Sequence, residues 1–383
     1  MTKYLNNLTP MRGIAALLTV FFHFDLMLGN GGGGIIATNF SPIMGKMYLM
    51  VDFFFILSGF IMSHVYSEMF STGVTFANYK TFFQARFARL YPLHLATLLF
   101  CIALYSLTAK MGIAAHPILE AENNFSTIIS NLFMVHSLNL HDWFSWNHAS
   151  WSISVEWATY MIFPFLVIPF MKMNNWLKIA TIVACFIAYI GIALYLVPMV
   201  NISKSLFFLP PDLSLKTINV SFQYGIFRCL AGFILGMAGY ELYRVDWLKK
   251  YLSNGYLIIT FALLSFVEMH LQLPDYVIVI PFLFIILAGA YGSEGINHFF
   301  ANKSLQHLGD WSFTIYMIHE PVMYMVNKIF VYSNALPNPR DIANNWLIIA
   351  WHLPLILLFS YLTYRFFEVP VRKWINPAKV NKS

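Results

Sequence analysis

The chain has 383 residues, of which 59% are hydrophobic and only 10% are charged. Soluble domains carry about 25% charged residues, so this composition excludes an ordinary soluble enzyme and predicts an all-α, polytopic membrane helix bundle. The formal net charge of +6 is typical of the cytoplasmic loops of membrane proteins, and we expect no nucleic-acid partner. The three cysteines lie in apolar runs, which predicts neither a disulfide nor a metal site.

The first predicted element is the apolar segment 8–28, which is long enough to cross a bilayer as a helix. It nevertheless contains Arg12, His23 and Asp25. Charged groups in a membrane helix cost several kcal/mol, so they are rare and usually functional. Arg12 and His23 are 11 residues apart, close to three helical turns and about 16 Å along the axis, so both leave the helix on nearly the same face. We interpret this face as one wall of a polar passage from a membrane surface to a buried site.

Ten segments are predicted to span the membrane: 8–28, 48–66, 90–109, 151–171, 177–198, 222–241, 254–271, 276–292, 311–330 and 346–367. An even number of spans places both termini on one side. The segments on that side carry 16 of the 23 lysines and arginines, and those on the other side carry six. Positive charge concentrates in cytoplasmic loops, so we predict that both termini are cytoplasmic. The whole chain, 1–383, is predicted to be one membrane-embedded domain without an appended soluble domain.

Polar residues mark the ends of the second and third spans. Asp52 opens the segment DFFFILSGF at the outer end of a span. A helix dipole would favour a carboxylate there, and the same carboxylate could orient a catalytic histidine. Arg86 and Arg89 are three residues apart and share a helix face at the inner end of the next span. Guanidinium groups suit phosphates, but an anchor at the cytoplasmic surface without a ligand is also open.

The segment SWSISVEWATY opens the fourth span from the outer side. Ser152 and Glu156 are four residues apart and share a face. A carboxylate at this depth needs a partner or must be protonated. Glu156 either orients a histidine, holds a substrate hydroxyl, or forms a structural ion pair with Arg228. Arg228 itself implies a buried anion, which is Glu156, Asp52 or a ligand.

Histidines occur at two further places. His136, His141 and His148 surround a short apolar stretch, but no tight ligand spacing is present, so we predict no metal site. His319 and Glu320 lie within the ninth predicted span, where a histidine satisfied inside the core is the commoner explanation. The combination in the first span is more informative, because an imidazole that titrates near neutral pH shares a face with an arginine. This favours catalysis or proton-coupled transport, and the residues alone do not separate the two.

The ordered set of segments resembles a known family. RGIAALLTVFFH, DFFFILSGF, RFARLYPLH, SWSISVEW, the FILGM glycine span, SFTIYMIHEPV and RFFEVPVRKW, which extend in that order from residue 10 to residue 374, resemble the membrane acyltransferase-3 family. These bacterial enzymes acylate cell-surface sugars. The resemblance implies about ten spans, a cytoplasmic acyl-CoA donor and an acceptor sugar hydroxyl at the outer face. Many relatives carry a further C-terminal hydrolase-like domain; without one, we expect transfer to be completed within the membrane domain.

The resemblance also implies roles for particular residues. The family's arginine–histidine pair of the first span corresponds to Arg12 and His23, its RxxR motif to Arg86 and Arg89, and its SxSVE segment to Ser152, Ser154 and Glu156. We therefore expect His23 to be the general base. Either Glu156 or Asp52 would hold its imidazole.

The predicted ligand contacts complete this interpretation. Arg12, Arg86 and Arg89 would bind the phosphates of CoA, and Trp151, Ser152 and Arg228 would contact substrate. No permanently bound cofactor is expected.

The sequence thus predicts an O-acyltransferase of the bacterial inner membrane. It would move an acetyl group from acetyl-CoA to a surface carbohydrate or its lipid-linked precursor, and an acyl-histidine intermediate remains open. The alternatives are a transporter or flippase for a lipid-linked sugar, and a membrane scaffold without enzymatic activity.

Overall fold

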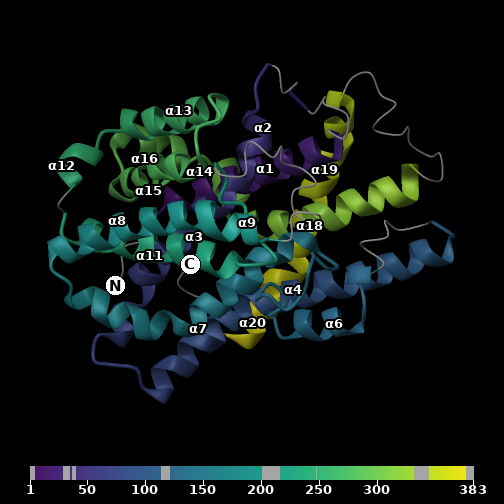
Figure 1. Cartoon of the computed structure of the whole chain (residues 1–383), viewed down its shortest axis with the longest axis horizontal. Helices are drawn as coiled ribbons and strands as arrows, with labels where there is room; N and C mark the ends of the chain where they lie inside the picture. The colour runs from purple at the N-terminus through teal and green to yellow at the C-terminus, as the bar shows by residue number, and fades with distance from the viewer. Residues whose placement is uncertain are drawn as a thin grey trace.

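A computed structural model describes residues 5–28, 35–36, 40–113, 121–200, 216–246, 248–331 and 345–376. Within these residues every regular element is helical, and a single isolated β-bridge joins Ser221 and Tyr224. This confirms the all-α class (Figure 1).

The longer helices are α1 (Leu8–Leu28), α3 (Met50–Tyr66), α4 (Phe76–Lys110), α7 (Trp151–Lys172), α8 (Asn175–Gly191), α11 (Gly225–Arg244), α13 (Tyr256–His270), α15 (Ile280–Tyr291), α18 (Ser312–Met325) and α19 (Asn345–Thr363). The shorter ones are α2 (Ile43–Lys46), α6 (Phe125–Leu132), α9 (Val197–Met199), α12 (Lys249–Leu252), α14 (Asp275–Ile278), α16 (Glu294–Phe300), α17 (Lys303–Asp310) and α20 (Val369–Ile375). Brief 3₁₀ or π segments extend several of them: η1 (Met47–Leu49), η2 (Glu68–Phe70), η3 (His148–Ser150), η4 (Ile192–Leu196), η7 (Val326–Val331) and η9 (Tyr364–Glu368).

A helix lies at each of the ten ranges that the sequence predicts as spans. Within the described residues, five continuous helical stretches are long and apolar enough to cross a bilayer: Ile43–Tyr66, Phe76–Lys110, His148–Lys172, Asn175–Met199 and Gly225–Arg244. A sixth is added if Asp275–Tyr291 and Glu294–Phe300, which meet at a 94° bend, form one span. The number of ten spans and the cytoplasmic termini therefore stay predictions.

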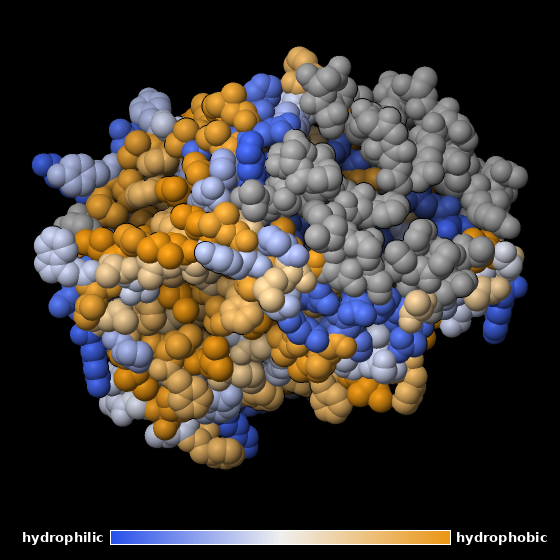
Figure 2. Space-filling model, viewed as in Figure 1, coloured by the Kyte–Doolittle hydropathy of each residue, from blue (hydrophilic) through white to orange (hydrophobic). Residues whose placement is uncertain are grey.

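Apolar side chains also cover outer faces of the bundle. Leu177, Val183 and Ile187 project from α8, where they are between 51% and 62% exposed, and α13 exposes Ile259 and Leu263. Figure 2 shows that hydrophobic residues cover much of the left half of one face. A continuous apolar surface of this kind is costly in water and is suited to lipid.

The centre of the bundle is the close packing of α3 against α11. A Cβ at Gly59 would collide with the backbone carbonyl of Phe233, and one at Gly236 would collide with that of Ile56. Small residues allow membrane helices to approach this closely. In the same way, Gly13 and Gly309 allow α1 to pack on α17, which fixes the helix that carries His23.

A buried ion pair also joins α3 to α11. Arg228 and Asp52 are both fully buried, and their closest nitrogen and oxygen atoms are 2.5 Å apart. The guanidinium group further donates to the carbonyl of Val220 and lies over the rings of Tyr48 and Trp151 at 5.5 Å. Asp52 is therefore the anion that Arg228 required.

Candidate active site

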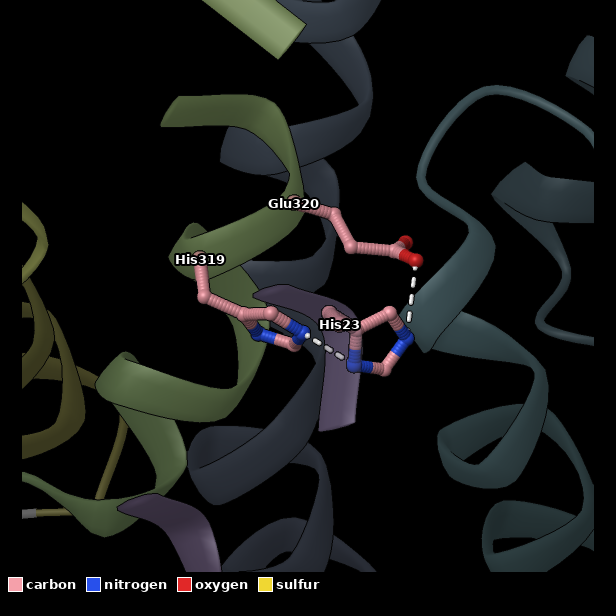
Figure 3. A group of neighbouring side chains, drawn as sticks. All are labelled: His23, His319 and Glu320. Carbon is pink, nitrogen blue, oxygen red and sulfur yellow. Dashed lines mark hydrogen bonds and ion pairs between the residues drawn. The ribbon is translucent and has the colours of Figure 1, made fainter. Parts of the chain in front are cut away.

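Two histidines and a carboxylate from α1 and α18 meet inside the bundle (Figure 3). His23 Nε2 lies 3.0 Å from Glu320 Oε1, and His23 Nδ1 lies 3.2 Å from His319 Nε2. His319 is fully buried, whereas the side chains of His23 and Glu320 keep 19% and 20% of their surface exposed. Figure 3 shows the three side chains pointing toward one another.

The backbone carbonyls around this cluster indicate which imidazole nitrogen atoms carry a proton. His319 Nδ1 lies 2.7 Å from the Tyr316 carbonyl oxygen, which can only accept a hydrogen bond, so this nitrogen carries a proton. A neutral His319 then accepts at Nε2, and His23 Nδ1 donates to it and to the Thr19 carbonyl at 2.9 Å. His23 Nε2 is left facing the Glu320 carboxylate. This nitrogen and this carboxylate can hold one exchangeable proton between them.

A proline explains how the turn before α7 reaches this cluster. Pro321 lies inside α18 and has no N–H, so the carbonyl of Met317, one turn earlier, loses its helical partner. Asn147 Nδ2 donates to that carbonyl at 2.9 Å. Two residues later, the backbone N–H of Ala149 donates to Glu320 Oε2 at 2.6 Å. The turn therefore fixes the Glu320 carboxylate against His23.

His23 and Glu320 line a cavity of about 310 Å³. Its other lining residues are Leu26, Cys101, Leu104, Tyr105, Asn123, Trp146, His148, Pro321, Met323, Tyr324 and Asn327. We call this space the histidine cavity. It is mixed in character, because aromatic rings, amides and an imidazole share its wall with aliphatic side chains.

A second cavity, of about 150 Å³, lies toward the other end of α1 and contains Arg12, Arg86 and Arg89. We call it the arginine cavity. The charged residues that line it are these three arginines and Glu156, so it carries two more positive than negative charges. Its polar lining also includes Ser58, Ser152, Tyr160, Ser312 and Tyr316. Local positive charge of this kind is suited to an anionic ligand.

The partners of these arginines differ. Arg86 donates to the hydroxyl of Tyr66 at 2.8 Å and lies over the rings of Tyr66 and Tyr160. Arg89 forms an ion pair with Glu368 and lies over Phe313. Arg86 is therefore held mainly by aromatic groups, whereas part of the charge of Arg89 is already neutralised.

The two cavities share no lining residue. Tyr316 lies at the boundary, since it lines the arginine cavity and its ring is 5.9 Å from that of His319. Its hydroxyl is 2.7 Å from the Ser152 hydroxyl, which joins α18 to α7. Tyr316 thus contacts both the lining of the arginine cavity and the histidine pair.

The structure brings together some predicted site residues and separates others. Arg12, Arg86, Arg89, Ser152 and Glu156 line one cavity, and His23 lines the other. Trp151 and Arg228 line neither cavity and pack against each other, and their contact with substrate stays a prediction.

The predicted partners of the imidazole were wrong. Asp52 is paired with Arg228, and Glu156 accepts hydrogen bonds from Ser58 and, at 2.6 Å, from Tyr160. The carboxylate that contacts His23 is Glu320, 297 positions later in the chain. The sequence signal for it was the pair His319–Glu320 inside a predicted span, where ionisable residues are rare.

The cluster also has the spacing of a metal site. The ligand atoms of His23, His319 and Glu320 all lie within 4.8 Å of one another. The same atoms already bind one another, and zinc sites in proteins use three or four such ligands. The predicted absence of a metal remains a prediction.

Comparisons with known proteins identify the family of this chain. Residues 5–365 match the acyltransferase-3 family, described as an acyltransferase domain. The peptidoglycan O-acetyltransferase OatA of Listeria monocytogenes is 21% identical, over 97% of this chain and 56% of OatA. A putative O-acetyltransferase of Staphylococcus aureus is 24% identical, over 97% of this chain and 58% of that protein. Protein 2 in the picA locus of Rhizobium radiobacter is 28% identical over 40% of this chain.

No solved structure matches the chain. The chain spans little more than half the length of the first two relatives. The family match nevertheless extends over nearly all of it, and its described residues include five helices able to cross a bilayer. The protein is therefore a multi-pass membrane protein that belongs to the acyltransferase-3 family.

Proposed function

We propose that this protein is a bacterial inner-membrane O-acyltransferase that moves an acetyl group from acetyl-CoA to a hydroxyl of a carbohydrate. The observation that carries the proposal is the contact between His23 Nε2 and Glu320 at the wall of a cavity. A base that accepts a proton beside an open space is what an attacking hydroxyl requires. Two relatives are named as O-acetyltransferases, which supports acetyl as the transferred group.

The donor is proposed to bind through the arginine cavity. The phosphates of CoA would pair with Arg12, Arg86 and Arg89, because guanidinium groups form strong, directed bonds to phosphate oxygens. Arg12 and His23 belong to the same helix and are 11 residues apart, about 16 Å along its axis. The extended pantetheine arm would carry the thioester over this distance.

The chemical step is a direct acyl transfer. The acceptor oxygen attacks the thioester carbonyl carbon while its proton passes to His23 Nε2, and the resulting imidazolium pairs with Glu320. The tetrahedral intermediate then expels the CoA sulfur, which takes the proton from His23 as the C–S bond breaks. The products are the acyl ester and CoA thiol, and the His23–Glu320 pair returns to its starting state.

The separation of the two cavities adds one requirement. Since the arginine cavity and the histidine cavity share no lining residue, we expect a side-chain movement to open the way for the thioester. Tyr316, which lines the arginine cavity and contacts His319, is the group that we propose to move. The Tyr316–Ser152 hydrogen bond is one of the contacts that this movement would break.

The first test follows a labelled acetyl group. With the protein in membrane vesicles and acetyl-CoA labelled in its acetyl group, we expect label to accumulate in surface carbohydrate or its lipid-linked precursor. A transporter of lipid-linked sugars is the alternative left open by the sequence. It would move the sugar across the vesicle membrane, and the sugar would carry no labelled acetyl group. That second result would reject the proposed function.

Replacing Glu320 by glutamine is expected to lower kcat by about 10²-fold or more, since general acid–base catalysis contributes roughly 10²–10⁴-fold. The amide keeps the shape but no longer stabilises the imidazolium. The acid limb of the pH–rate profile should therefore move to lower pH, which steady-state kinetics between pH 5 and 9 would measure. A purely structural role would lower the amount of folded enzyme and leave the profile in place, and that outcome would contradict the assignment.

Replacing Arg86 by glutamine is expected to raise the KM for acetyl-CoA by about 10- to 100-fold with little change in kcat. A hydrogen bond to a charged group contributes roughly 1.5–3 kcal/mol, and lost ground-state binding appears in KM. Arg86 is the suitable arginine because its hydrogen-bond acceptors, the Tyr66 hydroxyl and the Met62 sulfur, are uncharged. Lys249→Gln, at an exposed ion pair on α12, is the matched control. An unchanged KM in Arg86→Gln would exclude this contact with CoA.

A further inference from the structure

Trp146 is held in an uncommon backbone conformation beside the histidine cavity. Its φ angle is +55°, a region that bulky residues rarely adopt because of steric strain. Two hydrogen bonds maintain it: the backbone N–H donates to Asn123 Oδ1 at 2.7 Å, and the indole Nε1–H donates to Thr127 Oγ1 at 3.0 Å. Thr127 is fully buried. Strain that the surrounding structure maintains in this way is concentrated at functional sites.

These bonds decide what the indole can offer a ligand. The single N–H of the ring is already bound to Thr127, so Trp146 contributes no hydrogen bond to the cavity. It contributes ring surface instead, because the side chain is only partly buried and lines the cavity together with Tyr105. The two rings meet edge to face with centroids 5.9 Å apart. The cavity therefore has a rigid aromatic wall.

Polar groups complete the same wall. Asn123 uses its Oδ1 for Trp146, and within the described part of the chain its Nδ2 group makes no hydrogen bond and keeps two donor hydrogens. His148 and Asn327 also line this space, next to His23 and Glu320. A purely apolar ligand such as an acyl chain would leave the Asn123 amide and the His148 imidazole without water, which is unfavourable. An aromatic face surrounded by amide groups matches a pyranose ring, which combines a face of C–H groups with a rim of hydroxyls.

We infer that Trp146, supported by Tyr105 and Asn123, is the residue that binds the sugar ring of the acceptor and determines acceptor specificity. This inference rests on the proposed function, since it places the acceptor in the histidine cavity. The ring stacks on Trp146, the Asn123 amide donates to a ring hydroxyl, and another hydroxyl is presented to His23 Nε2. Trp146 acts on binding and takes no part in the proton transfer.

The experiment compares acceptors in purified protein with labelled acetyl-CoA. The acceptors are methyl glycosides of glucose, galactose, mannose and N-acetylglucosamine, with glycerol as a polyol without a ring and 1-octanol as an apolar alcohol. Trp146→Ala is expected to raise the KM for the best methyl glycoside by about 10-fold, the size of one lost aromatic contact, with little change in kcat. Trp146→Phe, which keeps a ring, is expected to stay within about threefold of the wild type. Transfer to glycerol should be the same in all three proteins.

A matched control and a binding measurement keep the result interpretable. Trp176 on α8 is 80% exposed and lies outside both cavities, so Trp176→Ala should change nothing. The Kd for CoA, measured by calorimetry, should be unchanged in Trp146→Ala if the variant is folded.

Two outcomes would overturn the inference while the proposed function stands: an unchanged KM in Trp146→Ala, or a loss in Trp146→Phe as large as in Trp146→Ala. Wild-type transfer to 1-octanol in preference to every glycoside would overturn both the inference and the carbohydrate acceptor of the proposed function. A wild-type protein that binds no CoA and acetylates no acceptor would instead overturn the proposed function itself.

Discussion

Replacement of His23 by alanine is expected to reduce acyl transfer by about 10²–10⁴-fold, the contribution of a general base. The variant removes Nε2, the atom that faces Glu320 at 3.0 Å and lines the histidine cavity. Steady-state transfer of labelled acetyl from acetyl-CoA measures the loss in kcat. Binding of CoA should persist, because the arginine cavity shares no residue with the site of the substitution.

The control for this prediction is His270→Ala. His270 ends α13, is exposed, and contacts Ser41 rather than either cavity, so full activity is expected. Size-exclusion profiles of both variants establish that the protein is folded. If His23→Ala retained wild-type kcat with a normal profile, the proton would have to go elsewhere, and the proposed mechanism would be wrong.

Replacement of Asp52 by alanine is expected to destabilise the protein by about 3–5 kcal/mol, the cost of removing one partner of a buried ion pair. The Arg228 guanidinium would remain fully buried without its carboxylate. Thermal unfolding in detergent, followed by the loss of the folded species, measures the change. The effect should appear as lost stability, and the kcat of the remaining folded enzyme should stay near that of the wild type.

Two further variants separate this explanation from a catalytic role for Asp52. Asp246→Ala removes one side of an exposed ion pair, 57% exposed at Asp246, and should cost at most about 1 kcal/mol. Asp52→Ala combined with Arg228→Met removes both buried charges and should recover much of the lost stability. A stable Asp52→Ala protein with greatly reduced kcat would show that the carboxylate serves the reaction.

The helical architecture could be predicted from sequence because it depends on local signals. Apolar segments of sufficient length lie where the helices lie, and α1 spans the predicted range 8–28. The convergence of Arg12, Arg86 and Arg89 was also foreseeable, since positive residues near span ends gather at one surface of a bundle. The orientation of the termini depends on the membrane and stays a prediction.

The pairing of buried charges could not be predicted, because it depends on which helices touch. Asp52, Glu156 and a ligand were all possible anions for Arg228, and only the close contact of α3 with α11 selects Asp52. The same limitation concealed Glu320, which reaches His23 because α18 packs beside α1. Pro321 was the missed local clue, since a proline within a helix frees a carbonyl and marks a point where another segment can bind.

The separation of the arginine cavity from the histidine cavity has a consequence for the cell. Arg12 and His23 lie about 16 Å apart along one helix axis, so an uninterrupted polar channel past both would extend through much of an apolar layer about 30 Å thick. Such a channel would conduct protons and small ions and dissipate the gradients that the membrane maintains. If the contact of Tyr316 with Ser152 interrupts this path, a membrane enzyme can contain both cavities and still preserve the electrical insulation of the bilayer.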